Sequence, residues 1–197
     1  MAKPLKNLIL FKLGWIACVV FAAQGLPALS AAAVAVVVGI HLLGAPAMGK
    51  EALLLTVAAA MGIVWESLLT LSGLVSYPTA PGIAGLAPYW IVTMWVLFAT
   101  TINGGLAWVK RHWGVAAIAG GLGGPMAFAA GAGMGAVAFS NQWLSLTVIG
   151  LGWAILLPVL SLVSEAIADS TWLEPGYEES PEPNSFPAYL RRYGQGI

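Results

Sequence analysis

The chain has 197 residues, of which 59% are hydrophobic and 8% are charged, and its eight basic and eight acidic residues give a formal net charge of zero. Soluble domains usually carry about 25% charged residues, so this composition excludes an ordinary soluble domain. It also excludes a nucleic-acid surface, which needs clustered Lys and Arg. The single cysteine, Cys18, excludes an internal disulfide.

Six apolar runs predict an all-α bundle of six transmembrane helices within residues 1–169. Each run is close to the roughly 20 residues that a helix needs to cross a hydrocarbon core of ~30 Å. Together with short connections they occupy nearly all of this region, which leaves no room for a separate soluble domain. The predicted spans are Leu8 to Ala23, Ala28 to Leu43, Ala52 to Leu74, Pro88 to Val109, Trp113 to Phe139 and Trp143 to Ser164.

The basic residues predict how these spans are oriented. All of them precede or open the first span, or fall in the second connection, the fourth connection or the C-terminal tail. Because cytoplasmic connections retain Lys and Arg whereas translocated connections lack them, we expect both termini in the cytoplasm. These residues are Lys3, Lys6, Lys12, Lys50, Lys110, Arg111, Arg191 and Arg192.

The predicted connections are short, and the tail lacks the apolar residues for a core. Gln24 to Pro27 forms a predicted tight turn, which makes the first two spans an antiparallel hairpin. The neutral third connection, Val75 to Ala87, contains Tyr77 and is expected to lie at the lipid interface or to fold back over the bundle. Residues 170–197 are acidic and rich in proline, and we predict a largely disordered cytoplasmic tail.

Three of the nine tryptophans are candidates for a binding site. Trp90 is expected near the outer end of span four, whereas Trp65 and Trp95 are expected deeper in the bundle. Interfacial belts and core packing are the ordinary explanation for most tryptophans in such a chain. The alternative is an aromatic ligand pocket built from these three residues.

Span five combines small residues at regular spacing with a proline. Such spacing lets helix backbones approach closely, and Gly124-Pro125 is expected to kink or break the helix. One interpretation is a kinked packing helix at the centre of the bundle. The other is a discontinuous helix whose freed carbonyls line a substrate or ion site. The main row is Gly123, Ala127, Gly131 and Gly135, and the neighbouring row is Ala116, Gly120 and Gly124.

Glu66 is the sharpest candidate for chemistry. It lies about fifteen residues, hence ~22 Å, from the cytoplasmic start of span three, in the outer half of the membrane. A charge near the membrane centre costs about 2.5–3.5 kcal/mol, and no Lys or Arg is expected at this depth. We therefore expect Glu66 to be protonated or strongly hydrogen-bonded. It serves either a proton-coupled step or a structural hydrogen bond to Trp or Ser on another span.

A second polar group is expected near the cytoplasmic side. His41 and Asn103 lie at similar predicted depth, well over ~10 Å from Glu66 along the membrane normal. Polar pairs of this kind mostly hold helices together, and the alternative is a pocket facing the cytoplasm that also includes Asn7. With two histidines, one cysteine and no spaced cluster, the sequence predicts neither a metal site nor a cofactor.

Several of these motifs together resemble a known family. They are Asn7 ahead of Gly14-Trp15, Glu66, Pro88-Tyr89-Trp90 with Trp95 and Phe98, and Gly124-Pro125. They are similar to the domain of unknown function 2878 family, small bacterial polytopic membrane proteins without an established activity. The resemblance implies the bacterial inner membrane and supplies no mechanism. The Pro-x-Trp start of span four also resembles tryptophan-rich sensory proteins of the TspO type, but those have five spans and the rest of this chain departs from their pattern.

Three functions are consistent with the sequence. The first, which we favour, is binding or transport of an apolar small molecule or lipid by the Trp and Glu66 region. The second is an accessory subunit that docks on a membrane-protein partner through span five and the tail. The third is a membrane-embedded lipid-modifying enzyme using His41, Asn103 and cytoplasmic acids, which requires these groups within hydrogen-bond reach. No nucleic-acid partner is expected.

Overall fold

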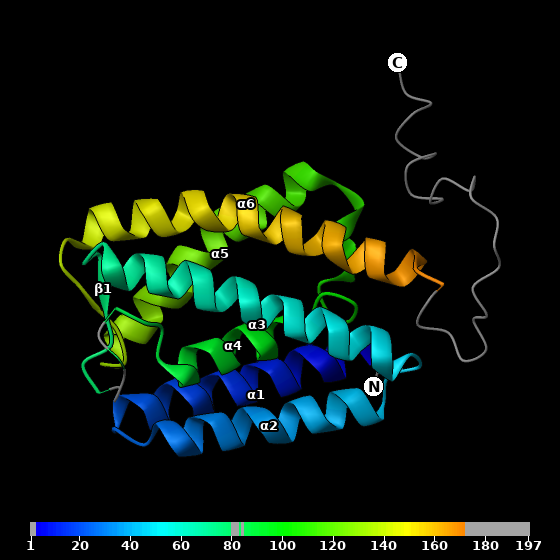
Figure 1. The fold of residues 1–197 in the computed structure, drawn as a ribbon, viewed down its shortest axis with the longest axis horizontal. Coiled ribbons are helices and arrows are strands. Elements are labelled where there is room, and N and C mark those ends of the chain that lie inside the picture. The colour runs from blue at the N-terminus through cyan, green and yellow to red at the C-terminus, as the bar shows by residue number, and fades with distance from the viewer. Residues whose placement is uncertain (1–2, 80–82, 84, 172–197) are drawn as a thin grey trace.

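Six α-helices run mostly along the long axis of the molecule in the computed structural model (Figure 1), which describes residues 3–79, 83 and 85–171. A short 3-10 helix and one pair of two-residue strands complete this part of the chain. Residues 172–197, which hold most of the predicted tail, lie outside it. The elements are α1 (Lys3–Ala23), α2 (Pro27–Leu43), α3 (Met48–Leu71), β1 (Val75–Ser76), α4 (Tyr89–Ala99), η1 (Ala107–Arg111), α5 (Trp113–Gly133), β2 (Ala138–Phe139) and α6 (Gln142–Asp169).

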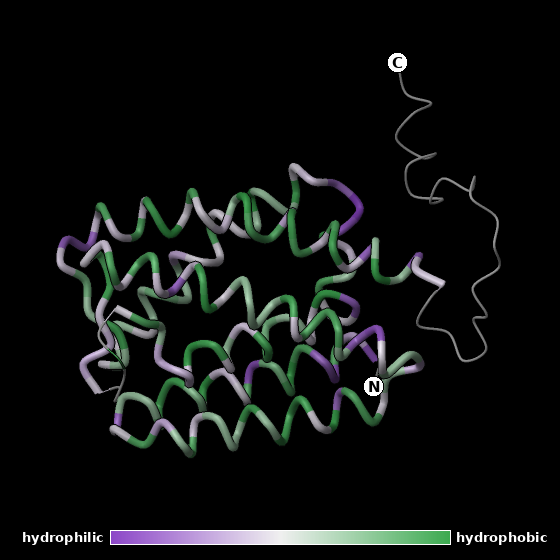
Figure 2. The backbone as a smooth tube through the Cα atoms, viewed as in Figure 1, coloured by the Kyte–Doolittle hydropathy of each residue, from purple (hydrophilic) through white to green (hydrophobic). Residues whose placement is uncertain are grey.

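The chain is all-α, and four of its helices, α1, α3, α5 and α6, are long and apolar enough to cross a membrane. The helices α2, with 17 residues, and α4, with 11, are shorter. Large apolar side chains also cover the outside of the bundle; Val36, Ile118 and Leu151 are each more than 60% exposed. Figure 2 shows the hydrophobic colour along the helices, with hydrophilic residues mostly near their ends. This surface is that of a membrane protein.

The predicted fourth span is the largest departure from the sequence-based expectation. Pro88 to Val109 was expected to form one helix, but α4 ends at Ala99 and turns lead to η1. The Thr101 hydroxyl donates back to the carbonyl of Phe98, and Asn7 of α1 donates to the Thr100 carbonyl while accepting from the Gly105 amide. These side-chain bonds satisfy backbone groups that a helix would otherwise pair, so the helix stops early.

The fifth span is also different, because α5 is continuous across Pro125 and ends at Gly133. Of the two predicted forms of this span, a kinked packing helix and a discontinuous helix, the structure does not have the discontinuous one. The helix α5 packs against α6 through the row that was predicted to be secondary, with buried Gly120 and Gly124 against Trp153. At Gly120 an added Cβ would meet the Trp153 carbonyl oxygen at 2.2 Å, so the two backbones lie closer than any larger residue allows.

The main predicted row has other roles. Gly123 has nothing within 4 Å of a Cβ built on it. Gly135 lies beyond α5 in a turn, with a positive φ of 86° that glycine adopts without strain. Gly131 is buried near Val137, just past this turn. Gly131 and Gly135 therefore shape the end of α5 rather than a helix interface along it.

The described residues of the third connection, 75–79, 83 and 85–87, fold back over one end of the bundle. Its strand β1 pairs antiparallel with β2, with Val75 opposite Phe139. The Ser145 hydroxyl of α6 donates to the Leu74 carbonyl at 2.7 Å, and the Ala87 amide donates to Ser67 Oγ at 3.0 Å. Tyr77 is buried as a result. Of the two predicted positions for this connection, the structure has the folded-back one.

Of the Lys and Arg residues that the structure describes, all except Lys12 belong to the other end of the bundle. The start of α1, the end of α2, the start of α3, η1 and the end of α6 meet there (Figure 1). Lys3, Lys6, Lys50 and Lys110 belong to this end. Lys12 was expected to open the first span, but it lies nine residues into α1, about 14 Å along the helix from Lys3.

Candidate ligand-binding site

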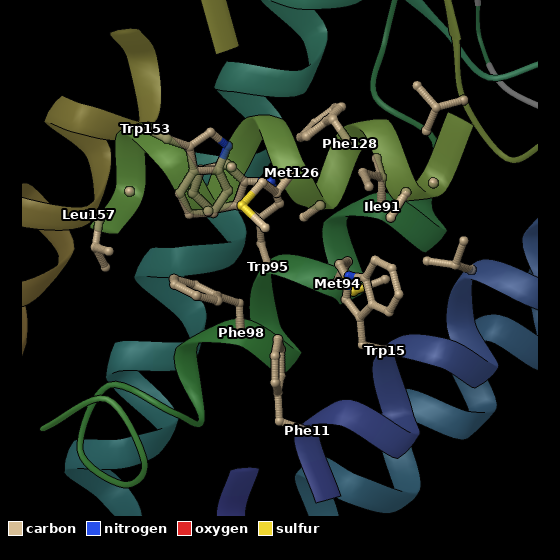
Figure 3. Close-up of a pocket in the computed structure, with 18 of the residues that line it drawn as sticks. Phe11, Trp15, Ile91, Met94, Trp95, Phe98, Met126, Phe128, Trp153 and Leu157 are labelled. Carbon is tan, nitrogen blue, oxygen red and sulfur yellow. The ribbon is translucent and has the colours of Figure 1, made fainter. Parts of the chain in front are cut away.

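A pocket of about 530 Å³ lies between α1, α4 and α5 (Figure 3), with α6 at its back. Its lining is almost entirely apolar and rich in aromatic rings, and among the described residues that line it only Lys12 and Glu66 are charged. Ligand pockets in proteins usually measure about 300–1,000 Å³ and combine such a lining with a few polar groups. The aromatic lining residues are Phe11, Trp15, Trp90, Trp95, Phe98, Phe128 and Trp153.

The pocket is elongated along the bundle and open at its side. On α5 its lining extends from Ala119 to Gly131, which corresponds to about 18 Å at 1.5 Å per residue. Several lining residues are exposed, including Lys12 on α1 and Met126 on α5, which is 71% exposed. The opening therefore lies between α1 and α5, on the apolar flank of the bundle.

Glu66 reaches the pocket wall from α3 and is completely buried. Trp95 Nε1 donates a hydrogen bond to one carboxyl oxygen at 2.8 Å, and the Tyr77 hydroxyl donates to the other at 2.5 Å. Burial, and then the neighbouring Glu66 carboxyl, raise the pKa of the Tyr77 hydroxyl well above its ordinary value, so Tyr77 keeps the proton that it donates. We call Glu66, Tyr77 and Trp95 the buried trio.

The buried trio supports an aromatic wall that runs from α4 to α6. The Trp95 and Trp153 rings stack with centroids 4.7 Å apart, and Phe98 meets Trp153 edge-on at 5.2 Å. Gly62 of α3 lies directly behind Trp95, because an added Cβ would come within 2.5 Å of the Trp95 ring. The orientation of Trp95 is thus fixed on three sides, by Glu66, Trp153 and the α3 backbone.

The three tryptophans singled out from the sequence do not all meet in this pocket. Trp90 and Trp95 line it. Trp65 does not: it packs from α3 against α6, where a Cβ on Gly152 would meet its ring at 2.1 Å. Its place in the lining is taken by Trp153 and Trp15, which come from helices whose position beside α4 no sequence pattern indicated.

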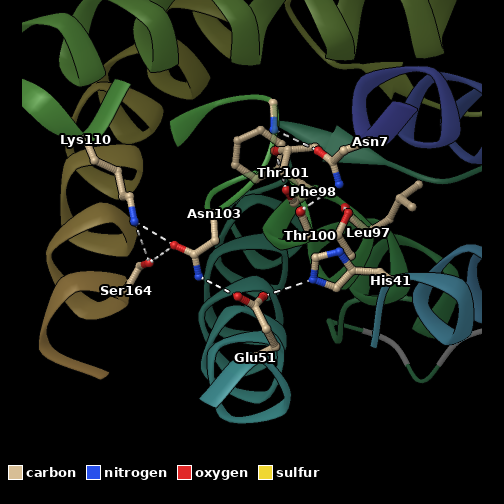
Figure 4. A network of polar contacts seen from close by, with 11 residues as sticks. Asn7, His41, Glu51, Leu97, Phe98, Thr100, Thr101, Asn103, Lys110 and Ser164 are labelled. Carbon is tan, nitrogen blue, oxygen red and sulfur yellow. Dashed lines mark hydrogen bonds and ion pairs between the residues drawn. The ribbon is translucent and has the colours of Figure 1, made fainter. Parts of the chain in front are cut away.

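His41 and Asn103 lie away from the pocket and bind the same carboxylate (Figure 4). His41 Nε2 lies 2.9 Å from one oxygen of Glu51, and Asn103 Nδ2 donates to the other at 2.8 Å. Lys110 and Ser164 both donate to Asn103 Oδ1, at 2.6 and 2.7 Å. This Glu51 cluster, made of His41, Glu51, Asn103, Lys110 and Ser164, ties α2, α3, η1 and α6 together at the basic end. Asn7 binds Thr100 and Gly105 nearby instead of joining it.

Sequence reasoning paired these polar residues only in part. A Trp from another span was one expected partner of Glu66, and Trp95 is that residue. Tyr77 was missed as the second partner because its loop position carries no periodic signal. Glu51 was missed because it lies in the first turn of α3, where an acidic residue is ordinary. Lys12 was missed because its charge matched the cytoplasmic side.

Within residues 3–79, 83 and 85–171, no three His, Cys, Asp or Glu side chains come together in a way that could hold a metal ion. The chain was also compared with known proteins. The model of a family described as "Protein of unknown function (DUF2878)" matches residues 4–159, from the start of α1 into α6. Neither a curated protein nor a solved structure matches the chain.

Proposed function

Because the chain belongs to the DUF2878 family, a family of unknown function, its role has to be inferred from its own geometry, and we propose that it binds an apolar small molecule or a lipid within the membrane. The observation that carries the proposal is the pocket of about 530 Å³ with its aromatic, almost uncharged lining. Because a side opening would let the bound molecule enter and leave, transport of that molecule is an extension of this function.

The shape of the pocket supports an apolar ligand from the membrane itself. Its side opening between α1 and α5 lies on a flank covered by exposed apolar side chains, among them Ile118, Leu122 and Met126. Molecules that reach this opening come from the lipid phase rather than from water. When such a molecule comes from water, burying its apolar surface among aromatic rings contributes about 25 cal/mol per Å². When it comes from lipid, close packing against the rings stabilises it instead.

The orientation proposed here is six crossings of a bacterial inner membrane, with both termini in the cytoplasm. Lys3, Lys6, Lys50, Lys110 and Arg111 belong to one end of the bundle, as the rule for cytoplasmic positive charge requires. The shorter helices α2 and α4 lie beside the long ones. In this proposal they cross the same hydrocarbon layer together with the turns at their ends. Reporter fusions to the turn at Lys110 and Arg111 test this, and a periplasmic signal there would contradict it.

In this proposal Glu66 holds the aromatic wall in place. Both of its carboxyl oxygens accept hydrogen bonds from Tyr77 and Trp95, so it orients Trp95 toward the ligand. A role in proton-coupled transport requires Glu66 to exchange its proton during a cycle, and uptake driven by a pH gradient would reveal it. Glu66→Gln should then abolish the coupling while leaving ligand binding in place.

The experiment that tests binding fills the pocket without disturbing the fold. Gly123 lines the pocket on α5 and has nothing within 4 Å of an added Cβ, so Gly123→Phe places a ring in the ligand's space. Gly39, in the last third of α2, also has open space around it but does not line the pocket. Gly39→Phe is therefore the matched control.

The measurement is native mass spectrometry of the purified protein, which counts lipid or other apolar molecules retained through detergent washing. Wild type and Gly39→Phe should retain a bound molecule. The fraction of Gly123→Phe that retains one should be lower by at least about tenfold, because an occluded cavity leaves no room for the ligand. Equal retention by all three proteins would contradict the proposal.

The two other candidate functions have less support. A lipid-modifying enzyme needs His41 and Asn103 clustered, and they do meet at Glu51. However, none of the residues of the Glu51 cluster lines the pocket, so a substrate held there would not reach them. An accessory subunit predicts a stoichiometric partner after mild detergent extraction, and the described contacts neither require nor favour one.

A further inference from the structure

The pocket contains one charged side chain that the bundle leaves without a counter-ion. Lys12 lines the opening, is exposed, and lies about 14 Å along α1 from Lys3, within a helix long enough to cross a membrane. Its ammonium group lies 5.7 Å from the centre of the Trp15 ring. In the part of the chain that the structure describes, no carboxylate forms an ion pair with it. A lysine at such a position usually serves a function, because its desolvation is costly.

The other polar atoms of the lining are donors as well. Trp90 and Trp153 line the pocket, and Trp90 is only 1% exposed. Their indole N–H groups are buried and have no acceptor among the described residues. A buried donor without a partner calls for an explanation, and an acceptor atom of a ligand is one for a donor in the pocket lining. The Glu66 oxygens, in contrast, already accept two hydrogen bonds.

The polar groups of the lining that have no acceptor therefore include one cation, Lys12, and the buried N–H donors of Trp90 and Trp153. A ligand that matches them carries acceptor oxygens, and a negative charge matches Lys12 best, because hydrogen bonds between ionised partners are roughly twice as strong as neutral ones. The lining beyond Lys12 is aromatic and aliphatic along α5 for about 18 Å. That length suits an extended hydrocarbon chain rather than a compact ring system.

From this arrangement we infer that the pocket takes an anionic amphiphile, a hydrocarbon chain with a carboxylate or phosphate headgroup, and that Lys12 binds the headgroup. The inference rests on the proposed binding function and specifies its ligand class. The headgroup lies at the level of Lys12, beside the Trp15 ring and about 14 Å along α1 from Lys3. The chain lies along Trp15, Trp90 and Trp153.

Quenching of the protein's tryptophan fluorescence by brominated lipids tests this inference. Purified full-length protein in detergent micelles is titrated with a dibrominated C18 fatty acid, with its methyl ester and with the corresponding phosphatidic acid. The bromine atoms quench Trp15, Trp90 and Trp153 when the chain occupies the pocket. The fatty acid and the phosphatidic acid separate the two sources of the anionic group, and the ester lacks the charge.

The test variant is Lys12→Gln, and Lys6→Gln is its matched control, since Lys6 is an exposed lysine of α1 that does not line the pocket. We expect Lys12→Gln to weaken binding of one or both anionic probes about tenfold and to leave the methyl ester unchanged, while Lys6→Gln matches wild type. Saturable quenching that is equal for acid and ester, and insensitive to Lys12→Gln, would overturn the anionic ligand class but keep the binding function. An absence of saturable quenching of the wild type by every probe, or quenching that is unchanged in Gly123→Phe, would contradict the binding function itself.

Discussion

The two glutamates of α3 are only fifteen residues apart, yet their surroundings are opposite. Glu51, at the basic end, is about 13% exposed and binds His41 and Asn103, with Lys110 one hydrogen bond further away. Glu66, about 22 Å along the helix, is fully buried and binds only the neutral donors of the buried trio. Near water a carboxylate can be stabilised by charge, whereas inside the bundle it depends on exact placement of neutral donors.

This contrast assigns different roles to the two groups. A cluster of partly exposed polar and charged side chains can exchange partners with water at modest cost, so the Glu51 cluster fastens the helix ends. A buried polar group that loses a partner costs much more, because the low dielectric offers no substitute. The buried trio therefore stabilises one rigid arrangement of Trp95, and with it the pocket wall. Three substitutions test this distinction.

The largest expected effect is that of Glu66→Ala. It leaves the Tyr77 hydroxyl and the Trp95 N–H buried without an acceptor and opens a cavity, so the free energy of unfolding should fall by about 3–5 kcal/mol. Titration of the purified protein with a denaturing detergent measures it. Glu66→Gln is the matched control, because its amide keeps one acceptor for Trp95 and donates to Tyr77, and it should cost about 1 kcal/mol. If the two variants were equally unstable, the carboxyl charge rather than its hydrogen bonds would hold the wall.

A smaller effect is expected from Gly62→Ala, which acts on the buried trio from behind. The new methyl group would lie within 2.9 Å of three Trp95 atoms, so the ring must shift away from Glu66. Crowding of this kind costs about 1–3 kcal/mol, partly offset by about 1 kcal/mol from the better helix propensity of alanine. The shift should also change the tryptophan fluorescence spectrum.

Gly49→Ala is the control for this substitution within the same helix. Gly49 lies near the Glu51 cluster and has nothing within 4 Å of an added Cβ. Gly49→Ala should therefore be neutral or slightly stabilising and leave the fluorescence unchanged. Equal destabilisation by both substitutions would indicate that α3 tolerates no side chain at either glycine, and that Trp95 has no special role.

The fold was predictable from the sequence to the extent that apolar length determines it. The six apolar runs correspond to six helices. The predicted turn at Gln24 to Pro27 connects α1 to α2, and α2 begins at Pro27. The prediction of one long fourth span was wrong because side chains compete with the backbone, as at Thr100 and Thr101. This competition does not change hydropathy, so a hydropathy pattern does not reveal it.

The site was less predictable than the fold. Depth along the membrane correctly separated Glu66 from His41, because helix rise converts directly into distance. It does not report which face of a helix meets which neighbour. For this reason Trp65 was grouped with Trp90 and Trp95, although it packs against Gly152. Helix rise gives no depth for Tyr77, because this residue lies in a loop whose position follows from the pairing of β1 with β2.

The smallest effect is expected from Glu51→Gln, and it should depend on salt where Glu66→Ala does not. The glutamine keeps an acceptor for Asn103 but loses attraction to His41 and Lys110, which for a partly exposed group is worth about 1 kcal/mol or less. At about 1 M NaCl the Debye length falls to about 3 Å, so this difference should shrink toward zero. The same detergent titration at low and high salt measures it for both glutamates. A salt-independent loss as large as that of Glu66→Ala would show that the Glu51 cluster is as rigid as the buried trio, and would remove the distinction between the two ends of α3.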